Sequence, residues 1–226
     1  MQLQVAVDRL SLDEALVLAV LVHPYADWIE VGTSLIKEFG MEAVRQMRRM
    51  LPGMRLLADC KTVDEGRYEF ELCYAAGADS ATVMALAPDA TLHACAAVAR
   101  RLEKQVAIDL HATGRERQEH LLRTFDDARF DWHAGKDTQA AAGARADVLL
   151  PHLPAWAATR TIAVAGGIEL GDIPVVGARF PMATVVIGSA IIHAPDPGAA
   201  ARAFADALAP FRTKQGSARW GHSGRS

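Results

Sequence analysis

Short apolar runs rich in β-branched residues recur along the chain, and segments with helical spacing of apolar residues separate them. Runs of this length, bounded by polar or glycyl residues, are typical of strands. The pattern predicts eight strands: Leu3–Asp8, Trp28–Val31, Arg55–Lys61, Ser80–Ala85, Val106–Leu110, Arg129–His133, Ile162–Ala165 and Thr184–Ile187. It predicts helices near 12–22, 40–50, 66–76, 89–102, 115–124, 139–146 and 152–158, a short weak one near 169–177, and a last one at about 197–209.

Strands that alternate with helices indicate βαβ units and a parallel sheet. Eight such units predict an α/β fold, a single-domain (β/α)8 TIM barrel. The alternative is an open doubly wound sheet, which needs fewer strands and often a glycine-rich first turn, and no such turn follows Asp8. We expect the barrel domain to occupy residues 1–211. The segment 212–226 has basic, glycyl and seryl residues and no acids, which predicts a disordered tail.

Composition narrows the classes of protein. The 226 residues are 51% hydrophobic and 23% charged, which is ordinary for a globular chain with a sizeable core. A net charge of −3 provides no basic field for nucleic acid, so no nucleic-acid partner is expected. The three cysteines have neither zinc nor disulfide spacing, which favours a reducing cytoplasm. The first residues do not resemble a signal peptide, and no apolar run approaches the ~20 residues of a membrane span.

Polar or glycyl residues end many of the predicted strands. In barrels of this type the active site lies at the carboxyl ends of the strands, so these side chains should converge on one mouth. They are Asp8, Glu30, Asp59 with Lys61, Asp109, His133, Gly166 with Gly167, and Gly188 with Ser189.

The segment from Asp59 to Asp64 is the richest in charge. Side chains alternate along a strand, so Asp59 and Lys61 should point one way and Cys60 the other, toward the helices. Burying such charges is costly unless they pair or bind an ion, which indicates a functional role. The alternative, a solvated turn after the strand, is equally compatible with this segment taken alone. Lys61 could donate to a developing oxyanion, with Asp8 and Asp64 in the same charged network.

Glu30 and Asp59 end neighbouring strands. Mg²⁺ is typically bound by one or two carboxylates together with substrate oxygens and water, so these two acids are the predicted metal ligands. The alternative is that Glu30 pairs with Lys61 without a metal.

His133, at a strand end, is a candidate general acid or base, although a lone histidine is more often structural. We expect the structural role for the others: His23, His93, His111, His120, His152, His193 and His222. The glycines after the last two strands, Gly166, Gly167 and Gly188, are predicted to bind phosphate through backbone N–H groups together with Ser189. Each glycine motif alone could equally be an ordinary turn.

These motifs resemble the orotidine 5'-monophosphate decarboxylase suprafamily, in its 3-hexulose-6-phosphate synthase and 3-keto-L-gulonate-6-phosphate decarboxylase branch. The resemblance runs from Leu3 to about Leu208. The motifs that carry it are Leu3–Asp8, Ile29–Thr33, Ala58–Asp64, His133–Gln139, Val164–Ile168 and Ile187–Ile191.

The resemblance implies a homodimer whose active sites lie at the interface, with Asp64 contributed to the neighbouring subunit's site. It implies that Glu30 and Asp59 bind Mg²⁺. It further implies that the metal and Lys61 stabilise a cis-enediolate of a sugar phosphate and that His133 transfers protons at the substrate carbon.

Two reactions share that enediolate. The synthase condenses D-ribulose 5-phosphate with formaldehyde, and the decarboxylase removes CO₂ from 3-keto-L-gulonate 6-phosphate. Asp109, Ala165 and Ser189 resemble the synthases, whereas Lys136 resembles the cationic residue of the decarboxylases. We therefore expect the synthase reaction, with Asp109 and Lys136 near the substrate. The alternatives are the decarboxylase, a barrel that binds sugar phosphate without turnover, and a catalytically silent interaction subunit.

Overall fold

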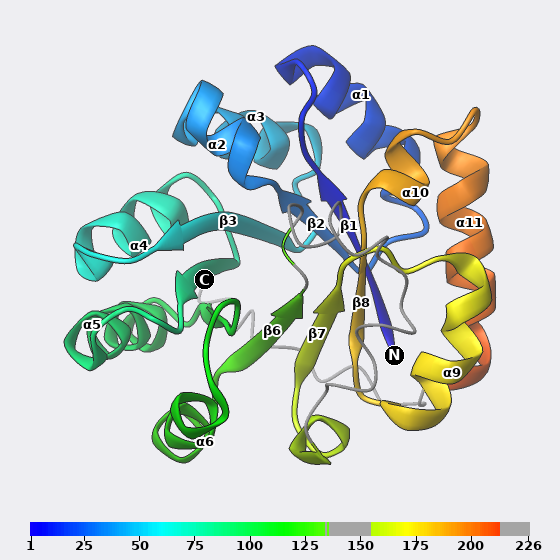
Figure 1. The fold of residues 1–226 in the computed structure, drawn as a ribbon. Helices are drawn as coiled ribbons and strands as arrows, with labels where there is room; N and C mark the ends of the chain where they lie inside the picture. Colours follow the sequence, from blue (N-terminus) through cyan, green and yellow to red (C-terminus); the bar gives the residue numbers. More distant parts are fainter. Residues whose placement is uncertain (134, 136–154, 213–226) are drawn as a thin grey trace, which may run out of the picture.

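The computed structural model describes residues 1–133, 135 and 155–212, and its strands form a closed parallel barrel (Figure 1). Each strand pairs with the next in the chain, and β8 pairs with β1. The strands are β1 Gln2–Val7, β2 Trp28–Val31, β3 Leu56–Thr62, β4 Ser80–Met84, β5 Gln105–Asp109, β6 Arg129–His133, β7 Ile162–Ala165 and β8 Thr184–Ile187. The predicted TIM barrel is confirmed, and all eight predicted strands are present within one or two residues of their expected bounds.

Helices surround the barrel (Figure 1). They are α1 Leu12–Val22, α2 Thr33–Phe39, α3 Met41–Met50, α4 Gly66–Ala75, α5 Asp89–Arg101, α6 Arg115–Thr124, α9 Ile173–Arg179, α10 Ser189–Ile192 and α11 Pro197–Leu208. Short 3₁₀ helices lie at Ala155–Ala158, Leu170–Asp172 and Ala209–Phe211. The predicted helix near 139–146 lies outside the described residues, as does the start of the one near 152–158, whose remainder is the first of the 3₁₀ turns.

The main apolar core lies between the sheet and the helices. On β1, Leu3, Val5 and Val7 are fully buried and belong to that core. Inside the barrel a separate small cluster is made by Trp28, Leu57 and Ala107. The alternation of each strand thus places apolar side chains outward under the helices and leaves much of the barrel interior to polar groups.

Asp79, just before β4, connects α3, β3 and the segment before β5 through hydrogen bonds at the end of the barrel where the strands begin. Its carboxylate accepts hydrogen bonds from Arg48 Nη2 at 2.5 Å, Lys104 Nζ at 2.7 Å and the Leu56 N–H at 3.0 Å. Burial raises the pKa of Asp79, but these three donors outweigh it and hold the pKa below its usual value. The group therefore stabilises the fold as a carboxylate.

The end of the described chain lies against its beginning. The Met1 amino group donates to the Phe211 carbonyl at 2.8 Å. The boundary at residue 211 and the disordered tail stay predictions, because residues 213–226 lie outside the described part. None of the helices in residues 1–133, 135 and 155–212 combines the length and apolar character that a bilayer crossing requires.

Candidate active site

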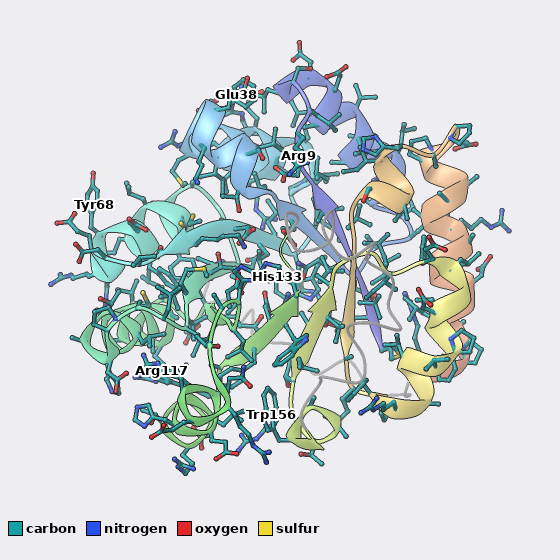
Figure 2. The ribbon with its side chains drawn as sticks, in the orientation of Figure 1. Arg9, Glu38, Tyr68, Arg117, His133 and Trp156 are labelled. Carbon is teal, nitrogen blue, oxygen red and sulfur yellow. The ribbon has the colours of Figure 1, made fainter. Side chains whose placement is uncertain are left out.

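A cavity of about 840 Å³ opens at the carboxyl ends of the strands, and every strand or the loop after it contributes to its lining. Most of the predicted site residues lie in it: Glu30, Asp59, Lys61, Asp109, His133, Gly166, Gly167, Gly188 and Ser189. Figure 2 shows His133 near the centre of the barrel, at the end of β6. The expectation that the strand ends converge on one mouth is therefore confirmed for these residues.

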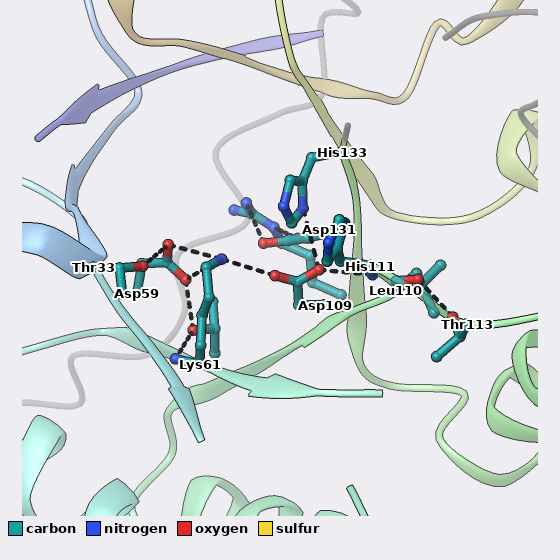
Figure 3. A network of polar contacts seen from close by, with 11 residues as sticks. Thr33, Asp59, Lys61, Asp109, Leu110, His111, Thr113, Asp131 and His133 are labelled. Atoms are coloured by element: carbon teal, nitrogen blue, oxygen red, sulfur yellow. Dashed lines mark hydrogen bonds and ion pairs between the residues drawn. The ribbon is translucent and has the colours of Figure 1, made fainter. Parts of the chain in front are cut away.

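Lys61 links two carboxylates in the cavity (Figure 3). Its Nζ lies 2.9 Å from Asp109 Oδ2 and 3.0 Å from Asp59 Oδ2. Burial alone would lower the pKa of Lys61, but Asp59 and Asp109 outweigh it and raise the pKa above its ordinary value. The group is therefore a positioned ammonium, suited to hold a developing oxyanion.

The backbone at Lys61 departs from regular strand geometry. Its φ is 51°, in the left-handed region, and the pairing of β3 with β4 shifts register between Ala58 and Thr62. Thr82 holds this turn, because its Oγ1 accepts from the Lys61 N–H at 2.9 Å and donates to Asp59 Oδ1 at 2.8 Å. A left-handed non-glycine residue costs about 1–2 kcal/mol, and the two hydrogen bonds of Thr82 help to offset that cost at Lys61.

Asp109, at the end of β5, contacts Lys61 and both histidines of the cavity, and its side chain is 2% exposed. Its Oδ1 lies 3.2 Å from His133 Nδ1 and accepts from the His111 N–H at 2.9 Å. Burial raises the pKa of Asp109, but His133 and Lys61 outweigh it, and the pKa lies well below the usual range. Because Nδ1 of His133 faces this carboxylate, Nε2 is the ring nitrogen left for a substrate.

Glu30 and Asp59 meet the first requirement of a magnesium site, which is two carboxylates close together. Burial, followed by the charge of Asp59, raises the pKa of Glu30 to about 8. Gln4 Nε2 donates to Glu30 Oε2, and Thr33 Oγ1 donates to Asp59 Oδ2 at 2.7 Å. A divalent cation would relieve the repulsion between the two acids.

Among the described residues, no group of three or more His, Cys, Asp or Glu side chains has the arrangement of a metal site. Glu30 and Asp59 would suit a cation that takes two ligands from the protein and the rest from substrate and water, as Mg²⁺ commonly does.

A second ion pair lies deeper in the barrel. Arg129 is 2% exposed and contacts Asp131 through Nε at 2.6 Å and Nη2 at 3.2 Å. Its Nη1 donates to Gln4 Oε1 at 2.7 Å, which connects the pair to Glu30. Asp131 lines the cavity and was not anticipated as a site residue. Strand alternation could have found it, since Arg129, Asp131 and His133 share one face of β6.

The two glycine loops form the far end of the cavity. Gly166 and Gly167 have φ of 113° and 67°, conformations that glycine adopts without steric cost. Gly188 lies beside Ala6 of β1, where an added Cβ would come within 3.7 Å of the Ala6 carbonyl oxygen. Arg9, which follows β1, lines the same cavity with a left-handed φ of 56° and was not anticipated. Backbone N–H groups and a cation thus border one end of the cavity.

Two of the predicted residues lie elsewhere, and a third is outside the described part of the chain. Asp8 does not line the cavity, because its Oδ1 accepts from the Ser34 N–H at 3.0 Å in the first turn of α2. Asp64 is exposed after β3 and accepts from the Glu65 N–H at 2.8 Å. Lys136 lies outside the described residues. Asp64 is therefore not part of its own site's lining, and its predicted role in a partner's site stays a prediction.

Two expectations about non-site residues have opposite outcomes. Cys60 does point toward the helices, with its Sγ 2.9 Å from Cys73 Sγ of α4. His111, which we expected to be structural, instead lines the cavity and stacks on His133. Its position beyond the end of β5, where strand alternation no longer applies, is why the sequence pattern missed it.

The chain and its fold have clear relatives. The sequence model described as "Orotidine 5'-phosphate decarboxylase / HUMPS family" matches residues 1–204. A 3-hexulose-6-phosphate synthase of Mycobacterium gastri is 35% identical over 210 residues, which are 92% of this chain and 100% of that protein.

Solved structures agree with this match. A 3-hexulose-6-phosphate synthase from Salmonella typhimurium has a TM-score of 0.85 and 33% identity, covering 94% of this chain and 100% of that one. A 3-keto-L-gulonate-6-phosphate decarboxylase from Vibrio cholerae has a TM-score of 0.82 and 28% identity, covering 94% and 99%. The resemblance drawn from the sequence motifs is confirmed.

Proposed function

Because the chain belongs to the orotidine 5'-phosphate decarboxylase / HUMPS family, we propose that it is an aldehyde-lyase of the 3-hexulose-6-phosphate synthase type. It condenses D-ribulose 5-phosphate with formaldehyde through an enediolate. The observation that carries the proposal is the line of polar contacts Asp59–Lys61–Asp109–His133 across the cavity. It combines an ammonium for an oxyanion with a carboxylate-held histidine for a carbon-bound proton.

The substrate phosphate lies at the glycine end of the cavity. Backbone N–H groups of Gly166, Gly167 and Gly188 donate to it, as the loops after strands seven and eight commonly do in this fold. Arg9 supplies a full positive charge at the same end, since its guanidinium makes no ion pair with any described residue. This orientation directs the carbonyl end of the sugar toward Lys61 and His133.

The chemistry begins with proton transfer. His133 Nε2 takes the C1 proton, and the electron pair of the broken C–H bond forms the enediolate. Lys61 Nζ donates to its oxygen, where negative charge develops, and Asp109 keeps the His133 ring oriented and stabilises its protonated form. The enediolate carbon then attacks the aldehyde carbon and forms the new C–C bond.

Glu30 and Asp59 would hold Mg²⁺ as the cofactor, with Gln4 and Thr33 orienting the two carboxylates. When bound, the cation would supply further positive charge for the enediolate oxygens.

The assembly in this proposal is a homodimer that completes each site with the partner's Asp64. The three cysteines are free thiols, as expected in a reducing compartment, and the proposal includes a cytoplasmic location.

The second candidate is 3-keto-L-gulonate-6-phosphate decarboxylation, which uses the same enediolate. It is favoured by Lys136, a cation at the position where decarboxylases carry one, and by the likeness to the Vibrio cholerae decarboxylase. The paired assay of formaldehyde condensation and keto-gulonate decarboxylation tests the choice. A kcat/KM higher for ribulose 5-phosphate with formaldehyde supports the synthase. A higher value for the keto-gulonate reverses the choice, and binding of both without turnover leaves a sugar-phosphate-binding barrel.

A further inference from the structure

His111 places a second imidazole beside His133 in the cavity. The two ring centroids are 4.8 Å apart and the planes are 18° from parallel, a stacked arrangement visible in Figure 3. The His111 backbone N–H is fixed by Asp109 Oδ1 at 2.9 Å. Gly135 lies so close that an added Cβ would come within 2.7 Å of His111 Cε1. Both the main chain and the ring of His111 are therefore held at the cavity wall.

The proposed condensation moves protons at two different atoms. One leaves C1 of the sugar, and one must reach the oxygen of the aldehyde once the C–C bond has formed. Decarboxylation, in contrast, requires a proton at the substrate carbon alone. A single imidazole bound to Asp109 through Nδ1 has only Nε2 for both positions.

Apart from Arg9, which is assigned to the phosphate, most other side-chain donors in the described cavity wall are engaged. Lys61 contacts Asp59 and Asp109, and the hydroxyls of Thr33 and Thr82 donate to Asp59. His111 uses only its backbone N–H toward Asp109, and its ring nitrogens make no hydrogen bond with any described residue.

We propose that His111 is the catalytic acid for the aldehyde oxygen, an inference that rests on the proposed condensation. As the enediolate carbon bonds to the aldehyde carbon, the π pair of the C=O bond moves to oxygen. That alkoxide takes the proton from the His111 imidazolium and becomes the new hydroxyl. His111 is left neutral and His133 protonated, and exchange of one proton between them through water restores both. The ligand chemistry assigned to this wall is a small electrophilic aldehyde.

The test separates the two proton transfers. In a sample without aldehyde, NMR monitors how fast the C1 proton of ribulose 5-phosphate exchanges with deuterium from D₂O. This exchange rate reports the His133 step alone. Condensation with formaldehyde reports both steps. His111→Gln and His111→Ala should lower condensation by about 10²–10⁴-fold while C1 exchange stays within about twofold of wild type, the span expected for loss of one general acid. Intact C1 exchange also demonstrates that the variants fold.

His120→Gln is the matched control. His120 contacts Asp89 on the helix layer, 2.8 Å from its Oδ2, and does not line the cavity. It should leave both rates unchanged. Added imidazole should restore part of the condensation in His111→Ala, because it replaces the missing acid.

An equal fall of both rates in the His111 variants overturns the inference, because it makes His111 only a support for His133. Unchanged condensation overturns it as well. A wild-type protein that exchanges the C1 proton but condenses no formaldehyde overturns the proposed function and this inference together, so the two failures can be told apart.

Discussion

Lys61 and Asp109 form an ion pair across the mouth of the barrel, with Nζ 2.9 Å from Oδ2 and the carboxylate 2% exposed. The same carboxylate faces His133 through its other oxygen. One buried charge thus orients both the group expected to hold the oxyanion and the group expected to move the proton.

Replacing Asp109 by Asn should therefore impair both groups at once. The amide preserves size but removes the charge that holds the imidazole, so C1 exchange and condensation should each fall by about 10²-fold or more. Rates of the two reactions in the same preparation provide the measurement. Asp127→Asn, at an exposed pair with Arg100, is the control and should change neither rate. A variant that keeps wild-type C1 exchange would contradict the assigned role of Asp109.

Asp79 predicts a pH dependence of stability. Its pKa is lowered in the folded protein, so its contribution is present above the unfolded value of 3.8 and is lost as pH falls from there through the folded value. Asp79→Asn should lower the free energy of unfolding by about 1–3 kcal/mol at pH 7, because it weakens bonds to Arg48, Lys104 and Leu56. The difference from wild type should shrink below pH 4.

Urea unfolding at pH 7 and at several values between pH 4 and pH 3 measures this dependence. Asp206→Asn, at an exposed pair with Arg202, is the control. A difference that is the same at all these pH values would show that the charge of Asp79 is not what stabilises the fold.

Strand prediction succeeded because most strands contain a short apolar run and are followed by or end in a polar or glycyl residue. Strands such as Ile162–Ala165 and Thr184–Ile187 have the predicted bounds. The short helices Thr33–Phe39 and Ser189–Ile192 were not predicted, since four to seven residues contain too little helical repeat to detect.

The site residues that lie on strands were predictable, because side chains alternate between the two faces of a strand. This alternation places Asp59 and Lys61 together in the cavity, and it applies equally to Asp131, although that residue was overlooked. Arg9 and His111 lie just beyond their strands, where the backbone turns and the period of two ends. Asp8 ends a predicted strand, but its carboxylate accepts a hydrogen bond from the Ser34 N–H in the first turn of α2. The periodicity of the sequence does not reveal a local hydrogen bond of this kind.

Arg9 is predicted to bind the phosphate. Arg9→Gln should raise KM for ribulose 5-phosphate and weaken competition by inorganic phosphate by about tenfold, equivalent to ~1.4 kcal/mol, with kcat little changed. The reason is that a guanidinium bonded to phosphate contributes to binding in ground and transition states alike. Arg202→Gln, on α11, is the control.

A loss of kcat with unchanged KM in Arg9→Gln would contradict this role. So would an unchanged inhibition constant for phosphate, since that measurement does not depend on turnover.

The proposed metal site at Glu30 and Asp59 predicts metal dependence. Excess EDTA should abolish condensation, and Mg²⁺ should restore it. Glu30→Gln removes one of the two proposed protein ligands and should raise the Mg²⁺ concentration needed for half activity by about tenfold or more. Glu42→Gln, at a surface pair with Arg49, should leave the requirement unchanged. Full activity in excess EDTA would remove the metal from the mechanism.

Asp64 predicts a shared active site. Asp64→Asn and Lys61→Ala should each be nearly inactive alone, because every site in either homodimer lacks one group. In an equal mixture after subunit exchange, half of the dimers are mixed and one of their two sites is intact, so about a quarter of wild-type activity should return. A mixture of Asp64→Asn with the double variant carrying both changes contains no intact site and should stay inactive. If the first mixture also stays inactive although exchange is verified by mass labels on the two subunits, each barrel works with its own residues, and the exposed Asp64 belongs to no partner's site.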